Sequence, residues 1–197
     1  MQEACVKMTN NFLIVSFFTI NTPYEREVDI LINSLDKFDL PFHVEGVSNK
    51  GSWLANCAFK PTFCKEMMLK NNIPIVWVDC DAEILKYPKL FHELCDYDIA
   101  CHYFTRKSGK TELLSGTLYF NNTEASFDLL DRWEKSCGIN PTRWDQRSLE
   151  DVVATSNYIK VFDLPQSYVN IFDDGRVSVE DTFILHRQAS RRYKRLI

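Results

Sequence analysis

The stretch Ile73–Asp81 reads I-P-I-V-W-V-D-C-D, in which a short apolar run is followed at once by two carboxylates one residue apart. The run Ile73–Val78 has the length of one buried strand. In open α/β sheets, ligands bind at the carboxyl ends of the strands. At such an end, Asp79 and Asp81 can hold a hard divalent cation that keeps open coordination positions. The stretch predicts a metal site, and helix-capping or loop aspartates are the plainer alternative.

The segments before this stretch alternate between strand and helix patterns. Strands are predicted at Asn11–Thr19 and Phe42–Val47, where apolar residues run together. Helices are predicted at Glu25–Lys37 and at Ala58–Lys70, which has Pro61 in its first turn. Together with the stretch above, the order strand-helix-strand-helix-strand predicts an α/β fold with a mainly parallel, doubly wound central sheet flanked by helices.

The pattern becomes more mixed after Asp81. Short or amphipathic helices are predicted at Leu90–Cys95, Phe127–Cys137 (ended by Gly138) and Gln146–Thr155, with strands at Ile99–Phe104, Leu113–Phe120 and Lys160–Leu164. A second acid pair, in Asp96–Asp98, is interpreted as incidental. We expect one domain over residues 1–197, with a nucleotide-binding half at about 10–100 and an acceptor and sugar half at about 101–197.

Composition narrows the class of protein. The net charge is −4 and 45% of the 197 residues are hydrophobic, which predicts no nucleic-acid partner. No window is long enough for a membrane span, and no secretory signal is evident. The seven cysteines contain no C-x-x-C pair, and Cys57, Cys64, Cys95 and Cys101 lie in apolar segments. This pattern predicts buried, reduced thiols in a cytoplasmic protein rather than a zinc site.

A histidine and a basic cluster near the end of the sequence are further candidates. His186 follows the apolar run Phe183–Leu185, and a neutral imidazole is a suitable third ligand for a manganese-like ion. Ser190, Arg191 and Lys194 follow it and could stabilise a leaving diphosphate. The plainer alternatives are a core or surface histidine and a solvated basic segment.

Two residues of the first half could contact a nucleotide sugar. Tyr24 follows the first strand and its Thr19, and its ring could stack on a nucleobase. Lys60 stands where the second helix begins, from which a cation could reach a sugar or a phosphate. A half-buried tyrosine and an exposed lysine at a helix start are the respective alternatives.

Two short motifs of the second half could surround a sugar. In Ser115-Gly116, the glycine would let the backbone approach a ligand closely. Asp145 and Gln146 put a carboxylate and an amide just before a helix. Asp145 could be the N-cap of that helix, or it could face the reacting sugar.

Taken together and in order, these motifs resemble the GT-A glycosyltransferases of the nucleotide-diphospho-sugar transferase group, over nearly the whole chain. The segments that carry the resemblance are W-L-A-N-C-A-F-K-P at 53–61, V-W-V-D-C-D at 76–81, L-S-G-T-L-Y-F-N at 114–121, W-D-Q at 144–146 and H-R-Q-A-S-R-R-Y-K at 186–194. The resemblance implies a Rossmann-like GT-A fold. A narrower similarity, to the N-terminal glycosyltransferase domain of a multidomain enzyme from chlorella viruses, implies a viral protein in the host cytoplasm and a place in a larger enzyme.

The resemblance also implies a role for each candidate residue. Mn²⁺ or Mg²⁺ would be held by Asp79, Asp81 and His186, with Asp79 also near the ribose. The nucleotide and its diphosphate would be contacted by Thr19, Tyr24 (on a base, most plausibly uracil), Ser190, Arg191 and Lys194. The donor sugar would be surrounded by Lys60, Ser115 and Gly116, with Asp145 and Gln146 as the catalytic pair.

The expected reaction moves a sugar from a UDP-sugar donor to a hydroxyl acceptor, such as one on a glycan. Asp145 is the one candidate for the general base of an inverting enzyme. The D-Q pair and the late histidine resemble the retaining branch, which we favour. The alternatives are a haloacid-dehalogenase-like phosphatase, with Asp173-Asp174-Gly175 as its later acidic motif, and a non-catalytic sugar-nucleotide-binding module.

Overall fold

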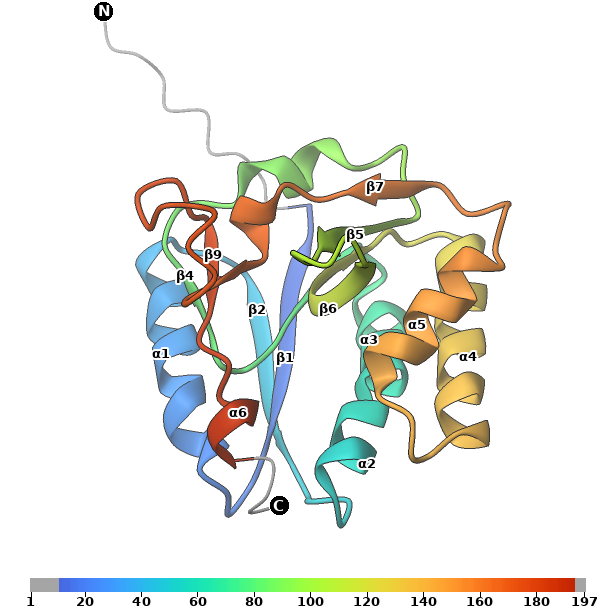
Figure 1. Cartoon of the computed structure of the whole chain (residues 1–197), viewed down its shortest axis with the longest axis horizontal. Helices are drawn as coiled ribbons and strands as arrows, with labels where there is room; N and C mark the ends of the chain where they lie inside the picture. Colours follow the sequence, from blue (N-terminus) through green and yellow to red (C-terminus); the bar gives the residue numbers. More distant parts are fainter. Residues whose placement is uncertain (1–10, 194–197) are drawn as a thin grey trace, which may run out of the picture.

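The computed structural model describes residues 11–193, and within them a central sheet has the strand order β2-β1-β3-β6-β5-β7 (Figure 1). Its strands are β1 (Leu13–Thr19), β2 (Phe42–Val47), β3 (Ile75–Val78), β5 (Ile99–Thr105), β6 (Thr111–Phe120) and β7 (Val161–Asp163). Strand β1 pairs in parallel with β2 and β3, and β5 pairs in parallel with β7. Only β6 runs against its neighbours in this sheet. The predicted mainly parallel α/β sheet is confirmed.

Helices cover both faces of this sheet. On one side lies α1 (Tyr24–Lys37), and on the other lie α3 (Lys60–Asn71), α4 (Glu124–Ile139) and α5 (Asp145–Ala154) (Figure 1). Strand β3 is buried along its whole length because helices cover both of its faces. The short α2 (Trp53–Ala58), the 3₁₀ turns η1 (Lys89–Glu93) and η2 (Gln166–Tyr168), and α6 (Ser190–Tyr193) complete the helical elements of the described chain.

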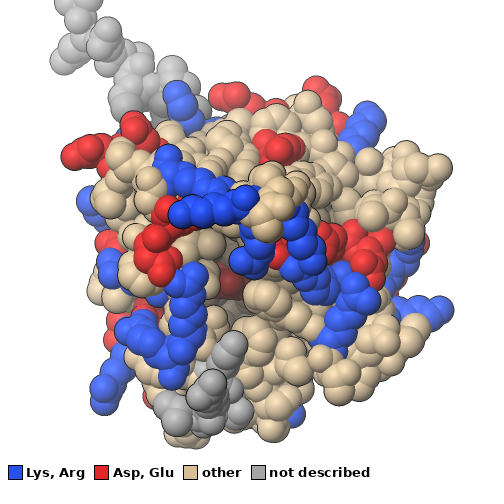
Figure 2. All heavy atoms as spheres, viewed as in Figure 1, with Lys and Arg blue, Asp and Glu red and all other residues tan. Residues whose placement is uncertain are grey.

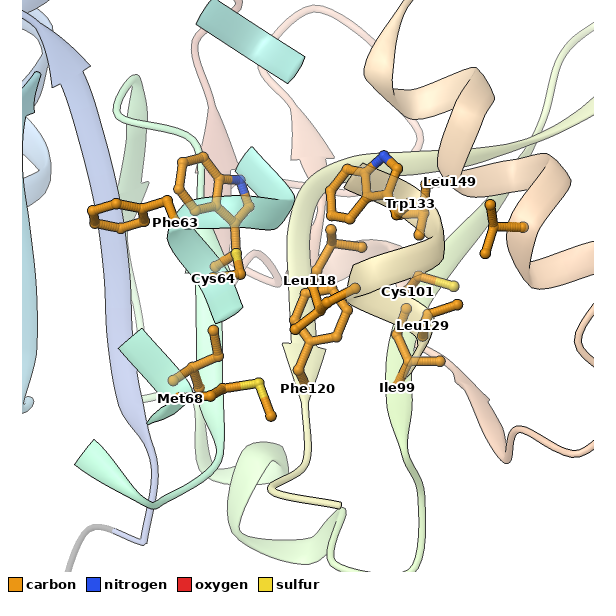
Figure 3. Close-up of a cluster of buried hydrophobic side chains, with 14 of the residues drawn as sticks. Phe63, Cys64, Met68, Ile99, Cys101, Leu118, Phe120, Leu129, Trp133 and Leu149 are labelled. Carbon is orange, nitrogen blue, oxygen red and sulfur yellow. The ribbon is translucent and has the colours of Figure 1, made fainter. Parts of the chain in front are cut away.

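The larger core cluster joins α3, α4 and α5 to the sheet. Figure 3 shows that side chains of these helices meet those of β5 and β6 there. Phe63 and Met68 come from α3, Trp133 from α4, and Phe120 from β6; all four are at most 2% exposed. This packing fixes the first residues of α3 and α5, Lys60 and Asp145, relative to the end of β3.

A second sheet brings the end of the described chain back to the middle of the sequence. Its order is β4-β9-β8, with strands β4 (Ala82–Ile84), β9 (Ile184–His186) and β8 (Asn170–Ile171). Strand β9 runs antiparallel to β4, and His186 pairs with Ala82. Because Ala82 follows Asp81, this register sets the imidazole beside the acid pair.

Two sequence predictions about local structure are wrong, and one alternative that the sequence left open is excluded. Helix α4 continues through Gly138 and ends at Ile139, because one glycine costs a helix only about 1 kcal/mol. Asp145 is the first residue of α5, and its N-cap is Trp144. Cys95 is exposed rather than buried. Helix α2 was also missed; the Ser52 hydroxyl caps it by accepting a bond from the Ala55 amide at 3.1 Å.

None of the helices within residues 11–193 is long and apolar enough to cross a membrane.

Candidate active site at the carboxyl end of strand β3

Asp79, Asp81 and His186 form a cluster with the composition of a metal site. One ligand atom from each lies within 4.8 Å of the others, so the three residues predicted from the sequence as ligands lie together. Asp79 and Asp81 follow β3, and His186 ends β9. Two carboxylate oxygens and one imidazole nitrogen suit Mn²⁺ or Mg²⁺ better than a soft metal. The residues present therefore fit a bound divalent cation.

Thr117 orients the imidazole of His186. Its Oγ1 lies 2.8 Å from Nε2 of the ring, and His186 is only 2% exposed. With Nε2 engaged by the hydroxyl, Nδ1 is the ring atom left to coordinate a metal. Burial lowers the pKa of His186 to about 4, which keeps the ring neutral at neutral pH. Thr117 was not among the residues predicted for the site, although it lies two residues after Ser115 on the same strand.

Gly116 leaves the space that the cluster occupies. A Cβ added to this residue would lie 3.0 Å from Cε1 and 3.1 Å from Nδ1 of His186. It would also lie 3.4 Å from Oδ2 of Asp79. Gly116 therefore faces the two ligand atoms directly, and any larger residue would intrude between the strand and the metal site.

The two oxygens of Asp79 have different surroundings. Oδ1 accepts hydrogen bonds from Lys60 Nζ and from Trp77 Nε1, each at 3.0 Å. Oδ2 faces Gly116 and the His186 ring. The Asp79 amide donates to the Gly116 carbonyl at 2.8 Å. These bonds hold the carboxylate so that one oxygen points to protein donors and the other to the cluster.

Asp81 connects the acid pair to the segment that follows β9. Its Oδ2 accepts a hydrogen bond of 2.5 Å from the Ala189 amide. Burial and the nearby Asp79 raise the pKa of Asp81 to about 6. Both effects follow from crowding two carboxylates into one buried site, and a divalent cation would relieve the repulsion between them.

Lys60 lies between Asp79 and a third carboxylate, that of Asp145. Its Nζ is 3.3 Å from Asp145 Oδ2 and donates to the Ser115 carbonyl at 3.1 Å. Burial would lower the pKa of Lys60, but Asp145 and Asp79 raise it, and the net change is upward. Burial also raises the pKa of Asp145, which Lys60 opposes. Lys60 is 4% exposed and therefore not the solvated lysine of the plainer alternative.

Asp145 is built into the fold but is not fully satisfied by it. The residue is 1% exposed, and its carbonyl accepts a 2.9 Å bond from Trp133 Nε1. Its Oδ1 is buried and finds no hydrogen-bond partner within the described part of the chain. A buried carboxylate oxygen without a donor is costly, which indicates that a ligand donates to it.

These residues line a cleft of about 460 Å³, a size suited to a small organic ligand. Figure 2 shows a hollow in this face of the molecule with basic side chains around it. Every candidate within the described residues lines the cleft: Thr19, Tyr24, Lys60, Asp79, Asp81, Ser115, Gly116, Asp145, Gln146, His186, Ser190 and Arg191. Lys194 lies outside the described residues.

The described candidates for nucleotide binding, Thr19, Tyr24, Ser190 and Arg191, have contacts of their own within the protein. Tyr24 contacts Tyr193 edge-on, with ring centroids 5.8 Å apart, and burial raises the pKa of the Tyr24 hydroxyl. Thr19 Oγ1 lies 2.9 Å from Thr22 Oγ1. Arg191 forms an ion pair with Asp173. A diphosphate would have to compete with this exposed carboxylate for the guanidinium.

Asp98 of the second acid pair, a pair interpreted from the sequence as incidental, has a structural role. Asp98 accepts hydrogen bonds from the Thr123 hydroxyl at 2.7 Å and from the Lys160 amide at 2.9 Å. These contacts join β5 to the start of α4 and to the segment before β7. Neither Asp96 nor Asp98 lines the cleft.

A mainly parallel α/β sheet that carries an Asp-Asp-His cluster at a strand end, in a cleft of nucleotide-sugar size, defines a GT-A-type glycosyltransferase. Sequence comparison agrees, because the sequence model of the nucleotide-diphospho-sugar transferases matches residues 10–191. The chain belongs to the nucleotide-diphospho-sugar transferase family and is a transferase enzyme. The haloacid-dehalogenase-like alternative is not supported. No curated protein sequence matches the chain.

Solved structures with the same fold include glycosyltransferases. One is a glycosyltransferase involved in the glycosylation of the major capsid of PBCV-1, a chlorella virus, with a TM-score of 0.74, 14% identity, and coverage of 93% of this chain and 96% of that one. The glycosyltransferase GlyE of Streptococcus pneumoniae has a TM-score of 0.59 and 14% identity, covering 88% of this chain and 54% of that one. The bifunctional glycosyltransferase WbbM has a TM-score of 0.56 and 12% identity, covering 92% and 46%. Viral origin and a larger parent enzyme stay predictions.

Proposed function

We propose that this transferase uses a bound divalent cation, Mn²⁺ or Mg²⁺, to move a sugar from a UDP-sugar to a hydroxyl group of a glycan, with retention of configuration. The observation that carries the metal dependence is the cluster of Asp79, Asp81 and His186, whose ligand atoms lie within 4.8 Å of one another. Its support is threefold: the ligands are preoriented, Gly116 leaves room, and the nearby Asp79 carboxylate together with burial raises the pKa of Asp81.

Residues at the nucleotide end would hold the donor. The Tyr24 ring would stack on the base, and Thr19 lies nearby on the same wall of the cleft. Ser190 and Arg191 would bind the diphosphate. Their hydroxyl group and guanidinium would stabilise the diphosphate as it leaves. When bound, the cation supplies Lewis-acid stabilisation of the leaving diphosphate. The protein ligands fix the position at which that stabilisation acts.

Residues at the sugar end would act on the donor sugar. Lys60, Ser115 and Gly116 form the floor beside it, and Gln146 adds an amide. Asp145 is held against Lys60, so protonation of this carboxylate would cost a buried ion pair. Although burial raises the pKa of Asp145, the ion pair with Lys60 opposes that rise, and we propose that it keeps Asp145 as a fixed negative charge beside a cationic transition state rather than as a general base. It therefore supports retention, in which the departing phosphate assists attack on the same face.

The proposed setting is the cytoplasm. The six cysteines of the described chain are free, and four of them are buried. Unpaired thiols of this number are typical of proteins from reducing compartments.

A panel of nucleotide sugars tests the function. We expect thermal stabilisation by UDP-sugars that requires Mn²⁺ or Mg²⁺, and slow release of UDP on incubation. NMR of the transferred or hydrolysed sugar gives the anomeric configuration of the first product, which should match the donor. Asp81→Ala should fold normally and lose metal-dependent turnover. Full turnover by this variant, or by wild-type protein in EDTA, would contradict metal dependence, and stabilisation by another nucleotide alone would contradict the UDP assignment.

A further inference from the structure

We infer that Trp144, backed by Trp53, is the platform on which the acceptor binds, and that this acceptor is a saccharide whose ring stacks on the indole. This inference rests on the proposed function and deepens it, since it assigns a second binding subsite to the same cleft. Neither tryptophan was among the residues expected to contact a ligand.

Trp144 is an exposed aromatic residue of the cleft. It is 39% exposed and lines the cleft. Of the large hydrophobic side chains exposed within residues 11–193, it alone lines the cleft; the others are Ile20, Leu69, Ile139, Tyr158, Phe172 and Val179. An indole left in water at the mouth of a site loses the benefit of burial, which a ligand that covers it would restore.

The indole is held in place before any ligand arrives. The Trp53 and Trp144 ring centroids are 5.7 Å apart with an interplanar angle of 50°. Trp144 is also the N-cap residue of α5, and the next residue, Asp145, is anchored by the bond from Trp133. A fixed ring loses little conformational entropy when a ligand stacks on it.

The position of Trp144 next to Asp145 puts the platform beside the reacting centre. Consecutive Cα atoms are only about 3.8 Å apart. Asp145 lines the cleft, and its Oδ1 is buried and has no donor among the described residues. A donor sugar whose hydroxyl group donates to this oxygen would therefore bring its reacting carbon within reach of a ring stacked on the indole.

Exposure distinguishes acceptor from donor. The donor-sugar candidates Lys60, Ser115 and Asp145 are each at most 4% exposed, as expected for a subsite that must exclude water. Trp144 is open to solvent, as a subsite must be when its ligand extends out of the cleft. The buried part of the cleft therefore suits the transferred sugar, and the exposed rim at Trp144 suits the end of an acceptor chain.

The chemistry of the rim favours a saccharide over a peptide or lipid hydroxyl. A pyranose ring offers a flat array of C–H groups on one face and hydroxyl groups at its edge. The indole face matches the first, and the polar side chains that line the cleft can match the second.

Transfer kinetics test this assignment, with methyl glycosides of common hexoses and pentoses as acceptors, and glycerol and a serine peptide for comparison. We expect Trp144→Ala to raise the KM for the glycoside about tenfold with kcat changed less than about threefold, because one stacked ring is lost. Trp144→Phe should recover most of the difference. Leu69→Ala, an exposed apolar residue of α3 outside the cleft, is the matched control and should match wild type.

A binding readout separates this role from a structural one. In wild-type protein with UDP and Mg²⁺, one indole N–H resonance, assigned by its loss in Trp144→Phe, should shift when the glycoside is added. Two results would overturn the platform but not the proposed function. In one, wild type transfers sugar and Trp144→Ala keeps the wild-type KM for the glycoside. In the other, wild type prefers glycerol or the peptide to every glycoside. Wild type that releases no UDP from any UDP-sugar would overturn the proposed function instead.

Discussion

Lys60 Nζ lies 3.3 Å from Asp145 Oδ2, and both residues are almost fully buried, at 4% and 1% exposed. The same ammonium group donates to Asp79 Oδ1 at 3.0 Å. One cation thus links the carboxylate on the metal side of the cleft to the carboxylate on the sugar side. Because a buried charge needs a partner, the three side chains fix one another, and a change to one should be felt by the others.

Lys60→Met should destabilise the protein by about 3 kcal/mol, because it leaves the buried charge of Asp145 without its partner. The double variant Lys60→Met/Asp145→Leu removes both charges and should recover most of the free energy of unfolding. Urea unfolding of the two variants and wild type measures this. Equal stability of Lys60→Met and wild type would show that the pair is not coupled.

Asp81→Asn should stabilise the metal-free protein at pH 7.5 and abolish its stabilisation by Mn²⁺. The folded pKa of about 6 is above the ordinary value of 3.8, so the stability that the Asp81 carboxyl contributes is full below pH 3.8 and lost as pH rises through 6. Asparagine removes that loss, of the order of 3 kcal/mol, and still offers an oxygen to the Ala189 amide.

The raised pKa of Asp81 also predicts how the affinity for the metal depends on pH. A proton and the cation compete for Asp81, so the affinity of wild type for Mn²⁺ should rise with pH up to about 6 and level off above it. His186 stays neutral over this range, because its pKa is lowered to about 4. Isothermal titration calorimetry from pH 5 to 8 measures the profile. An affinity for Mn²⁺ that does not change with pH over this range would show that Asp81 does not bind the metal.

The local pattern of the chain predicted the sheet and the acid pair well. Strands β1, β2 and β3 follow from short apolar runs and helix α1 from apolar periodicity, whereas α3 was predicted with Pro61 in its first turn. Asp79 and Asp81 follow from their place after a strand. Helix α2 was not predicted because its six residues are too few to show the helical period of apolar residues. Gly138 was wrongly predicted to end α4, because the packing of this helix outweighs the low helix propensity of one glycine.

The contacts that complete the site could not be predicted from the residues alone. His186 was suspected by residue type and resemblance, but its approach to Asp81 depends on the register of β4 and β9. Thr117 reads as an ordinary strand threonine until the fold sets it against the ring. The pairing of Lys60 with Asp145 joins two helix starts far apart in sequence, so only tertiary packing reveals it.

Thr117→Val should weaken metal binding by about 10- to 100-fold with little change in fold. Valine keeps the shape but removes the hydroxyl that lies 2.8 Å from His186 Nε2, so the ring loses the partner that fixes its orientation. Thr117→Ser retains the hydroxyl and should bind nearly as well as wild type. Calorimetric titration with Mn²⁺ in the presence of UDP compares the three proteins. Equal affinities would exclude an orienting role for Thr117.

Gly116→Ala should abolish metal-dependent turnover. The added methyl group would lie 3.0 Å from Cε1 and 3.1 Å from Nδ1 of His186, which is closer than ordinary van der Waals contact. The imidazole must give by a few tenths of an ångström in a buried site where Thr117 already holds it, and this displacement disturbs the approach of Nδ1 to the Asp79 oxygen. Mn²⁺ titration and UDP release should both fail, while circular dichroism remains native.

Gly138→Ala is the matched control, because it makes the same substitution where space is free. A Cβ at Gly138 meets no atom within 4 Å, and the residue lies within helix α4. Alanine there should raise the free energy of unfolding by about 0.5–1 kcal/mol and leave turnover unchanged. If Gly116→Ala turned over as fast as Gly138→Ala, the imidazole would not need its present position, and the Asp-Asp-His cluster would not be the metal site.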